Sequence, residues 1–462
     1  MNGWKPLLDG RLGERAWETV DAITGTLAPA AAPSTPLSDQ DSHPSVAGGM
    51  AGRALFFAYR SRAGTDREAH GEIASVLLEK ATDGLSNTPL APDLYGGFAG
   101  VAWAAEHLYS ARFQDEADAS AGDDEANDPL VEIDEALATY LDHKPWKADY
   151  DLIRGLTGLG VYALERLPRP TALACLAKVV ERLDETAEKG PQGTTWHTAP
   201  ELLPDWQRKL FPTGYYNLGV AHGVPGAIAM LGAASAAAGG MAASGDALAG
   251  PASNAGLARQ AREVAARARD LVHGAVRWLQ AQRMPAGEEA WFGGSFSAEV
   301  KPTKSRLAWC YGDPGIAAAL LVAARACREP AWEAYAIELG LHAAARPFAK
   351  AMINDACICH GSAGLAHLFN RLYQETGEPR FAAASRFWFG EALDFRQPGV
   401  GVAGYRAFAM DDDAVTPIWR SDAGFLEGAS GIGLALLGGL SDFEPAWDRI
   451  LALSAPDEPR GA

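Results

Sequence analysis

The sequence has few cysteines and few positive charges for its length. Five of its 462 residues are cysteine, an odd and sparse set that argues against a disulfide framework and is typical of reduced thiols or metal ligands. Lys and Arg number 40 against 58 Asp and Glu, which gives a formal net charge of −18. Phosphate contacts need clustered Lys and Arg, so this charge argues against nucleic acid and anionic membranes as partners. A peptide or a small molecule is the favoured partner.

Long hydrophobic runs are also missing. The N-terminus, Met1–Pro6, lacks the basic and then apolar pattern of a signal peptide, and the weakly apolar run Ala227–Ala243 is mostly Ala, Gly and Ser. We therefore expect a cytoplasmic protein with no membrane span. With 48% hydrophobic residues the chain can bury a large core, although its length alone would suggest two or three domains.

What the chain has in abundance is a glycine motif, Gly-x-x-Gly, followed by small and apolar residues over the length of a helix. Such helices are apolar around most of their circumference and belong inside a larger assembly. Between them lie amphipathic stretches such as Pro251–Gln280 and Pro330–Ala349, which suit an outer layer. The seven motifs are Gly49–Gly52, Gly97–Gly100, Gly155–Gly158, Gly223–Gly226, Gly312–Gly315, Gly361–Gly364 and Gly428–Gly431.

Alternating inner and outer helices predict an all-α protein, either an open solenoid or a closed double ring. A closed ring explains more, because it would gather the glycine turns around one central mouth and bring distant residues together. The repeat also overrides the expectation of several domains, so we predict a single domain over residues 1–462.

Four segments fall outside this helical pattern, and we predict them to be insertions in the ring. Residues 112–129 are acidic and indicate a solvated loop, and residues 233–256 are low-complexity Ala, Gly and Ser, which predicts a flexible surface insertion. Residues 190–217 and 284–304 combine aromatic residues with Pro and Gly, which favours extended or hairpin elements at the rim of the mouth. These two either contact substrate or pack down as covers on the ring.

Two of the glycine motifs indicate a metal site. Cys359 and His360 stand just before Gly361, and Cys310 stands just before Gly312. Adjacent residues diverge on a helix or a strand, but they can converge on one ion from a loop. Two thiolates and one imidazole would make a zinc site with an open fourth position, as in catalytic rather than structural sites. The alternative is that these cysteines are small buried apolar residues.

Several motifs together resemble those of the lanthionine synthetase C-like family, the cyclases of lanthipeptide biosynthesis. They are the stretch Gly219–Gly226 around His222, the stretch Trp309–Gly312, the stretch Cys359–Gly361 and the seven glycine-marked units. The resemblance covers nearly the whole chain. It implies an α/α toroid of seven inner and seven outer helices with short extended or hairpin insertions at its rim.

The resemblance also implies one zinc ion per chain at one end of the central cavity. The family's metal ligands fall on Cys310, Cys359 and His360. Cys357 is a nearby rival thiolate, but the family pattern has its cysteine directly before the histidine, which implies Cys359 and leaves Cys357 structural.

Four further site residues are implied by the same resemblance. Asp151 lies in a stretch similar to the family segment with a functional aspartate, and His222 takes the place of the family's active-site histidine. Arg306 and Tyr311 flank the first cysteine ligand where the family has an arginine and a tyrosine. On the residues alone, plainer interpretations are a helix N-cap for Asp151 and a satisfied core histidine for His222. For Arg306 and Tyr311 they are a surface charge and cavity packing.

The implied function is zinc-dependent addition of peptide cysteine thiolates to dehydroalanine or dehydrobutyrine, which closes (methyl)lanthionine thioether rings. Zinc would activate sulfur, because coordination deprotonates a thiol whose ordinary pKa is about 8.5. His222 is the expected acid–base residue, with Asp151 to orient it. Arg306 or Tyr311 would stabilise the enolate oxygen. The implied partner is a dehydrated precursor peptide with leader and core, and a dehydratase and a transporter are further candidates.

Three other functions stay open at this point. The same fold and metal could add glutathione or another small thiol to dehydrated residues in proteins. A non-catalytic scaffold could bind a leader peptide or a dehydratase. An α/α-toroid glycosidase would need a pair of carboxylates at the mouth, for which the turns offer chiefly Asp151, Asp313 and Glu427.

Overall fold

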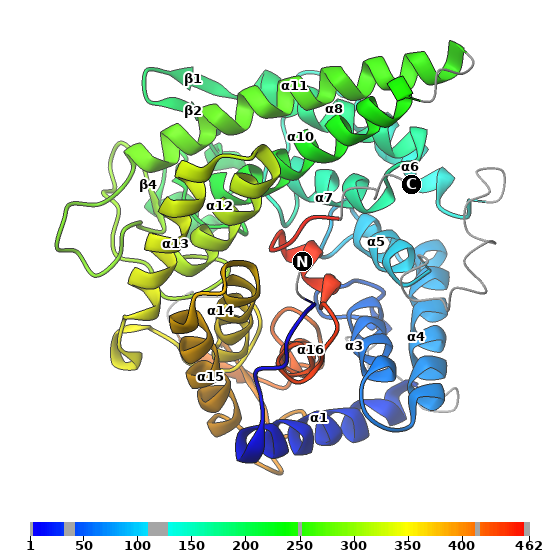
Figure 1. Cartoon of the computed structure of the whole chain (residues 1–462), viewed down its shortest axis with the longest axis vertical. Helices are drawn as coiled ribbons and strands as arrows, with labels where there is room; N and C mark the ends of the chain where they lie inside the picture. The colour runs from blue at the N-terminus through cyan, green and yellow to red at the C-terminus, as the bar shows by residue number, and fades with distance from the viewer. Residues whose placement is uncertain (1–2, 32–41, 110–127, 248–251, 412–415, 457–462) are drawn as a thin grey trace.

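The computed structural model describes residues 3–31, 42–109, 128–247, 252–411 and 416–456. Within these ranges an inner ring of seven helices surrounds the centre of the molecule (Figure 1). Each inner helix packs against the next, and the last packs against the first, so the ring is closed. In chain order these helices are α3 (Met50–Arg62), α5 (Phe98–Tyr109), α7 (Leu156–Arg166), α10 (Val224–Ala247), α12 (Asp313–Cys327), α14 (Ser362–Thr376) and α16 (Ala429–Leu440).

Seven outer helices cover this ring in the same described ranges. Most of them pack on the inner helix that precedes them in the chain, and α1 closes the outer layer by packing on α16. This arrangement confirms the predicted α/α toroid. The outer helices are α1 (Gly10–Ala31), α4 (Arg67–Asn87), α6 (Val131–Tyr140), α8 (Pro170–Thr186), α11 (Ala252–Ala281), α13 (Pro330–Ala344) and α15 (Pro379–Asp394).

Each inner helix begins directly after the first glycine of its motif. The motif is needed because the chain folds back tightly on itself there. A Cβ atom on Gly364 would lie 1.9 Å from the backbone oxygen of Ile358, and Gly312 has a φ of +121° that side chains rarely adopt. The residues before each first glycine are thereby held at one end of the ring, which we call the mouth.

A chain of backbone hydrogen bonds connects all seven turns at the mouth. Its N···O distances run from 2.9 to 3.4 Å. We call it the turn belt, and it places two of the predicted metal ligands side by side. In order around the ring, the N–H of each residue donates to the C=O of the next: Leu152, Ala221, Cys310, Cys359, Leu426, Ala47 and Tyr95.

In the part of the chain that the structure describes, three small antiparallel pairs of strands accompany the helices. Strands β1 (Glu188–Gly190) and β2 (Gly193–Thr195) form a hairpin, as do β5 (Ala407–Met410) and β6 (Pro417–Arg420). The third pair joins β3 (Tyr216–Asn217) to β4 (Ser295–Phe296).

The strand pairs show how the predicted insertions are built. Segments 190–217 and 284–304 contain extended elements as predicted, and the β3–β4 pair holds them together. Segment 190–217 also contains the short helices η3 (Pro200–Leu202) and α9 (Asp205–Leu210). Of the predicted acidic loop 112–129, residues 112–127 lie outside the described residues.

The prediction of a loop at 233–256 is wrong for residues 233–247 and 252–256, and residues 248–251 lie outside the described residues. Helix α10 continues to Ala247, and α11 begins at Ala252. Alanine is the strongest helix former, and small side chains let two helices approach closely. Here the Ser235 hydroxyl donates to the backbone oxygen of Ala265 across the α10–α11 contact, at 3.2 Å.

Helix α10 is also the one described helix that is long and apolar enough to span a membrane, over Val224–Ser244. Most of this stretch is buried against its neighbours in the ring. A core helix of a globular protein has the same length and composition, so the finding is weak support for a membrane span.

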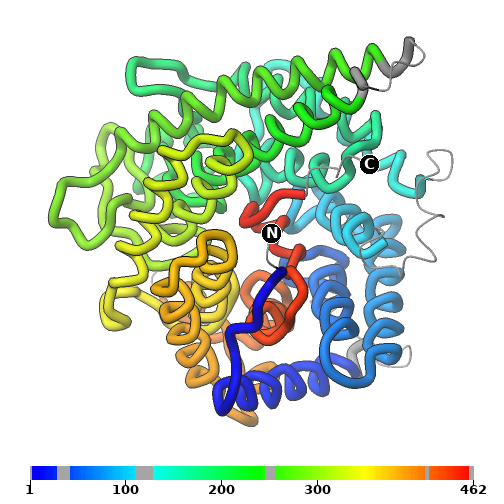
Figure 2. Tube along the Cα trace, in the orientation of Figure 1, coloured from blue at the N-terminus to red at the C-terminus, as the bar shows by residue number. Residues whose placement is uncertain are grey.

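The C-terminal segment lies inside the ring, beside the N-terminal segment (Figure 2). Its short helix η5 (Ala446–Leu451) is buried along most of its length. The Tyr95 hydroxyl donates to the backbone oxygen of Ile450 at 2.8 Å, and Trp309 Nε1 donates to that of Leu451 at 2.9 Å. Since Tyr95 belongs to the turn belt and Trp309 precedes Cys310, this segment supports the turns from within.

Candidate active site

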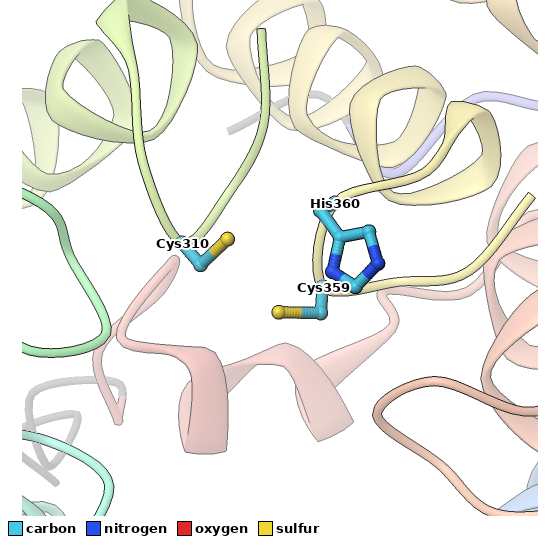
Figure 3. A group of neighbouring side chains, drawn as sticks. All are labelled: Cys310, Cys359 and His360. Atoms are coloured by element: carbon cyan, nitrogen blue, oxygen red, sulfur yellow. The ribbon is translucent and has the colours of Figure 1, made fainter. Parts of the chain in front are cut away.

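Three predicted metal ligands come together at the mouth. Cys310 lies in the turn before α12, and Cys359 and His360 lie in the turn before α14. One donor atom from each lies within 4.8 Å of the other two. Figure 3 shows both sulfur atoms and the imidazole ring facing a common space. The turn belt causes this approach, because Cys310 N donates to Cys359 O at 3.2 Å.

The chemistry of this group fits a zinc ion. Two sulfurs and one imidazole are typical zinc donors, and three protein ligands leave a fourth position for substrate. A hydrogen bond from the Cys359 thiol lowers the pKa of Cys310 well below its ordinary value, and His360 lowers it further. The site therefore already favours a thiolate at Cys310, which is the form that binds metal.

A second group shares the same histidine. It consists of Asp355, Cys357 and His360. Asp355 Oδ2 lies 3.7 Å from His360 Nε2, and its oxygens accept hydrogen bonds from the backbone of Cys357 and Phe408 at 3.1 and 2.8 Å. Burial raises the pKa of the Cys357 thiol to about 12. Asp355 is thus a carboxylate fixed beside the His360 ring at ion-pair distance, and Cys357 remains a buried thiol.

His222 and Asp151 form a pair close to the turn that contains Cys310 and Tyr311. His222 Nδ1 lies 2.5 Å from Asp151 Oδ2. The other oxygen of Asp151 accepts from Arg154 N at 2.7 Å, so the carboxylate also caps its own turn. Burial lowers the pKa of His222, but the Asp151 carboxylate outweighs it and raises the pKa overall. The negative charge of Cys310 acts in the same direction, as expected for a histidine that faces the thiolate side of the mouth.

Tyr311 and Arg306 approach the group from the turn that contains Cys310. The Tyr311 ring centre is 6.5 Å from that of His222, and its hydroxyl accepts a hydrogen bond from Asn217 Nδ2 at 2.9 Å. Burial raises the pKa of Tyr311 above its ordinary value, so the hydroxyl stays protonated. Arg306 is half-buried, and its positive charge helps to lower the pKa of Cys310.

Several neighbouring residues were not predicted as part of this site, although Glu427 was named as a carboxylate of the turns. Asp149 lies against the site, where burial and the charge of Asp151 raise its pKa to about 6, and Arg154 pairs with it at 3.3 Å. Burial also raises the pKa of Glu427. The negative charge of Glu427 in turn helps to raise the pKa of Cys359. A positional signal could have found two of them. Like His222, His360 and Tyr311, the residues Arg154 and Glu427 directly precede the first glycine of a motif.

The turns thus place an acid–base pair, a phenol and a guanidinium around a group of soft donors. Such a set can bind a thiol, keep it deprotonated and move a proton at a nearby carbon. It differs from a glycosidase site, which needs two opposed carboxylates. Asp313 is unsuited to that role, because its oxygens accept from the backbone of Trp291 and Phe292, each at 3.0 Å, and pair with Arg346.

Together, the closed double ring and the Cys/His group at its mouth define an α/α toroid with a candidate metal centre. The chain belongs to the lanthionine synthetase C-like family, whose model matches residues 40–452. A similar solved structure is that of "Nisin cyclase", which is 18% identical and superposes with a TM-score of 0.64, covering 95% of this chain and 97% of that chain.

Proposed function

We propose that the protein is a zinc-dependent lanthipeptide cyclase. It would add cysteine thiols of a dehydrated precursor peptide to dehydroalanine or dehydrobutyrine residues of the same peptide and form (methyl)lanthionine rings. The observation that carries this proposal is the group of Cys310, Cys359 and His360 beside the His222–Asp151 pair at one mouth, in a chain of this family. A zinc ion in that group would supply the Lewis acidity that keeps a substrate cysteine in its thiolate form at neutral pH.

The protein's own side chains account for the rest of the reaction. The substrate sulfur forms a bond to the β-carbon, and the electron pair of the double bond moves toward the amide oxygen. Tyr311 and Arg306 would stabilise the negative charge there, because one is a neutral donor and the other a cation close to Cys310. His222 would then deliver a proton to the α-carbon.

Asp151 makes His222 suited to this step. Its carboxylate holds Nδ1, so Nε2 is directed away from Asp151 and can exchange protons with substrate. The raised pKa of His222 keeps the imidazole protonated to a higher pH than usual. The peptide loses its thiol proton and gains one at carbon, so its mass does not change.

The proposal extends to partners and location. The substrate would be a precursor peptide with leader and core, supplied by a dehydratase and passed on to a transporter, and the reaction would take place in the cytoplasm. Residues 1–462 would act as one domain with one zinc ion.

The test is a thiol count on a dehydrated precursor peptide that cyclises slowly on its own. Purified protein with zinc should remove free peptide thiols, measured by alkylation and mass spectrometry, without added small thiols. If peptide thiols persist while added glutathione becomes attached to the dehydrated residues, the enzyme is instead a small-thiol transferase. If neither reaction occurs and the peptide still binds, the scaffold function holds.

A further inference from the structure

Asn217 connects the rim of the toroid to the candidate active site. It belongs to β3, and its pairing with Ser295 of β4 brings the two rim insertions together. Its side chain is buried, with 1% exposed, and contacts Tyr311. Nothing in the sequence motifs marks this residue.

The orientation of the Asn217 amide is fixed by one backbone group. Gly219 N lies 2.8 Å from Asn217 Oδ1. A backbone N–H only donates, so the amide atom that faces it must be the oxygen. The amide nitrogen is therefore on the other side, where it lies 2.9 Å from the Tyr311 hydroxyl and 3.1 Å from the Tyr215 hydroxyl.

This orientation determines the direction of both phenol contacts. An amide nitrogen has two protons to donate and no lone pair to accept with. Both phenol oxygens must therefore accept, and neither can direct its own proton at Asn217. Tyr215 is buried, whereas Tyr311 is partly exposed at the mouth near His222. The hydroxyl proton of Tyr311 therefore points away from Asn217.

We propose that Asn217 is a positioning residue that holds the Tyr311 hydroxyl as a hydrogen-bond donor toward the amide oxygen of the dehydrated substrate residue. A phenol that accepts one hydrogen bond is also a stronger donor in the next. This inference rests on the proposed function and adds the reason why Tyr311 serves as a donor rather than as packing.

The test uses two substitutions at Asn217 in the full-length zinc protein. Asn217→Asp keeps the shape and the bond from Gly219 but replaces the donor with an acceptor, so Tyr311 would turn its proton inward. Asn217→Ser removes the contact without adding charge. Because the enolate charge is absent from the bound substrate and develops in the transition state, we expect kcat to fall about tenfold for Asn217→Ser and more for Asn217→Asp, with KM and zinc content unchanged.

Two further variants show whether the effect passes through Tyr311. On a Tyr311→Phe background, which has no hydroxyl, both substitutions should cause no further loss. Tyr215→Phe, which removes the other partner of the same amide, should keep kcat within about twofold of the parent. Equal losses with and without the Tyr311 hydroxyl would overturn the proposal and make Asn217 a purely structural residue.

A spectroscopic measurement separates this inference from the proposed function. The carbon that bears the hydroxyl can be labelled with carbon-13 in tyrosine and assigned to Tyr311 by comparison with Tyr311→Phe. Its NMR signal should shift between parent and Asn217→Asp, whether or not the peptide is cyclised. A parent without cyclase activity would refute the proposed function alone, and an unchanged signal would refute the hydrogen-bond direction alone. If Asn217→Asp does not fold, Asn217→Ser takes its place in both measurements.

Discussion

Cys359 and Cys357 stand two residues apart but belong to different donor groups around His360. Of these two cysteines, only Cys359 shares a donor group with Cys310. We predict about one zinc per chain by metal analysis, lost in Cys310→Ala, Cys359→Ala and His360→Ala and kept in Cys357→Ala. All four should remain folded by circular dichroism, because the ring is held by helix packing rather than by metal. Zinc retained without Cys359 and lost without Cys357 would reverse the assignment.

In the proposed mechanism, proton delivery depends on His222. Its Nδ1 is held by Asp151, and Asn has no group that can exchange a proton at neutral pH. We predict that His222→Asn keeps zinc and fold but slows ring closure roughly a hundredfold or more, the scale for loss of a positioned acid–base group. The rate is measured as loss of alkylatable peptide thiols. A rate equal to that of the parent would move proton delivery to Tyr311, Asp151 or water.

Asp149 should make the fold depend on pH. Its pKa is about 6 in the folded state, mainly through burial, against an ordinary value of 3.8. A raised carboxyl pKa means that the folded state holds the proton more tightly, so its contribution to stability is lost as pH rises through this window. We predict that Asp149→Asn increases the free energy of unfolding at pH 7.5 by on the order of 1–3 kcal/mol. The increase should appear as a higher melting temperature.

The control for this prediction is the same pair of proteins at about pH 3. There Asp149 is mostly protonated in both the folded and the unfolded chain, and the difference in melting temperature should vanish. A variant that is less stable than the parent at pH 7.5 would show that the ion pair with Arg154 outweighs the burial of Asp149.

At the scale of elements, the glycine turns are the most constrained parts of the chain. A methyl group on Gly364 would meet the backbone oxygen of Ile358, whereas one on Gly390, also in a helix, would meet nothing within 4 Å. We predict that Gly364→Ala lowers the melting temperature and weakens zinc binding. Gly390→Ala should be neutral or stabilising by up to about 1 kcal/mol, the difference in helix propensity. Similar behaviour of the two variants would show that the turn can relax.

The same turns explain how much of the structure was predictable. Glycine motifs mark a local conformation, so all seven inner helices and the residues before them could be found from sequence. The helical run at 233–247 was missed because its Ala, Gly and Ser composition carries almost no periodic pattern. Hairpin β5–β6 joins two neighbouring segments but was not predicted. The bond from Asn217 to Tyr311 joins residues 94 positions apart, and nothing local indicates it.

At the scale of the whole molecule, the C-terminal segment is held in the ring by a buried ion pair. Asp448 and Arg371 lie 2.9 Å apart and are almost fully buried, and His367 contacts the same carboxylate. We predict that Asp448→Ala destabilises the protein by roughly 3–5 kcal/mol, because it removes the one buried carboxylate that Arg371 pairs with and leaves only the partly exposed Glu375 and Glu444. The melting temperature measures this.

A matched control comes from Glu444, one of the two other acidic partners of Arg371. Glu444 pairs with it at 2.7 Å, but its side chain is 47% exposed, and exposed pairs contribute little. Glu444→Gln should therefore change the melting temperature by only a small amount. Equal effects of the two substitutions would mean that water reaches Asp448.

The turn belt bonds the seven turns to one another through main-chain atoms only. Main-chain atoms are the same in every residue, so the spacing of Cys310 and Cys359 does not depend on which side chains occupy the other turns. The strand pairs β1–β2, β3–β4 and β5–β6 contribute no residue to this belt. These segments could therefore change in length or sequence during evolution while Cys310 and Cys359 kept their separation. Residues that reach the mouth from them, such as Asn217 beside Tyr311, would set the limit of that exchange.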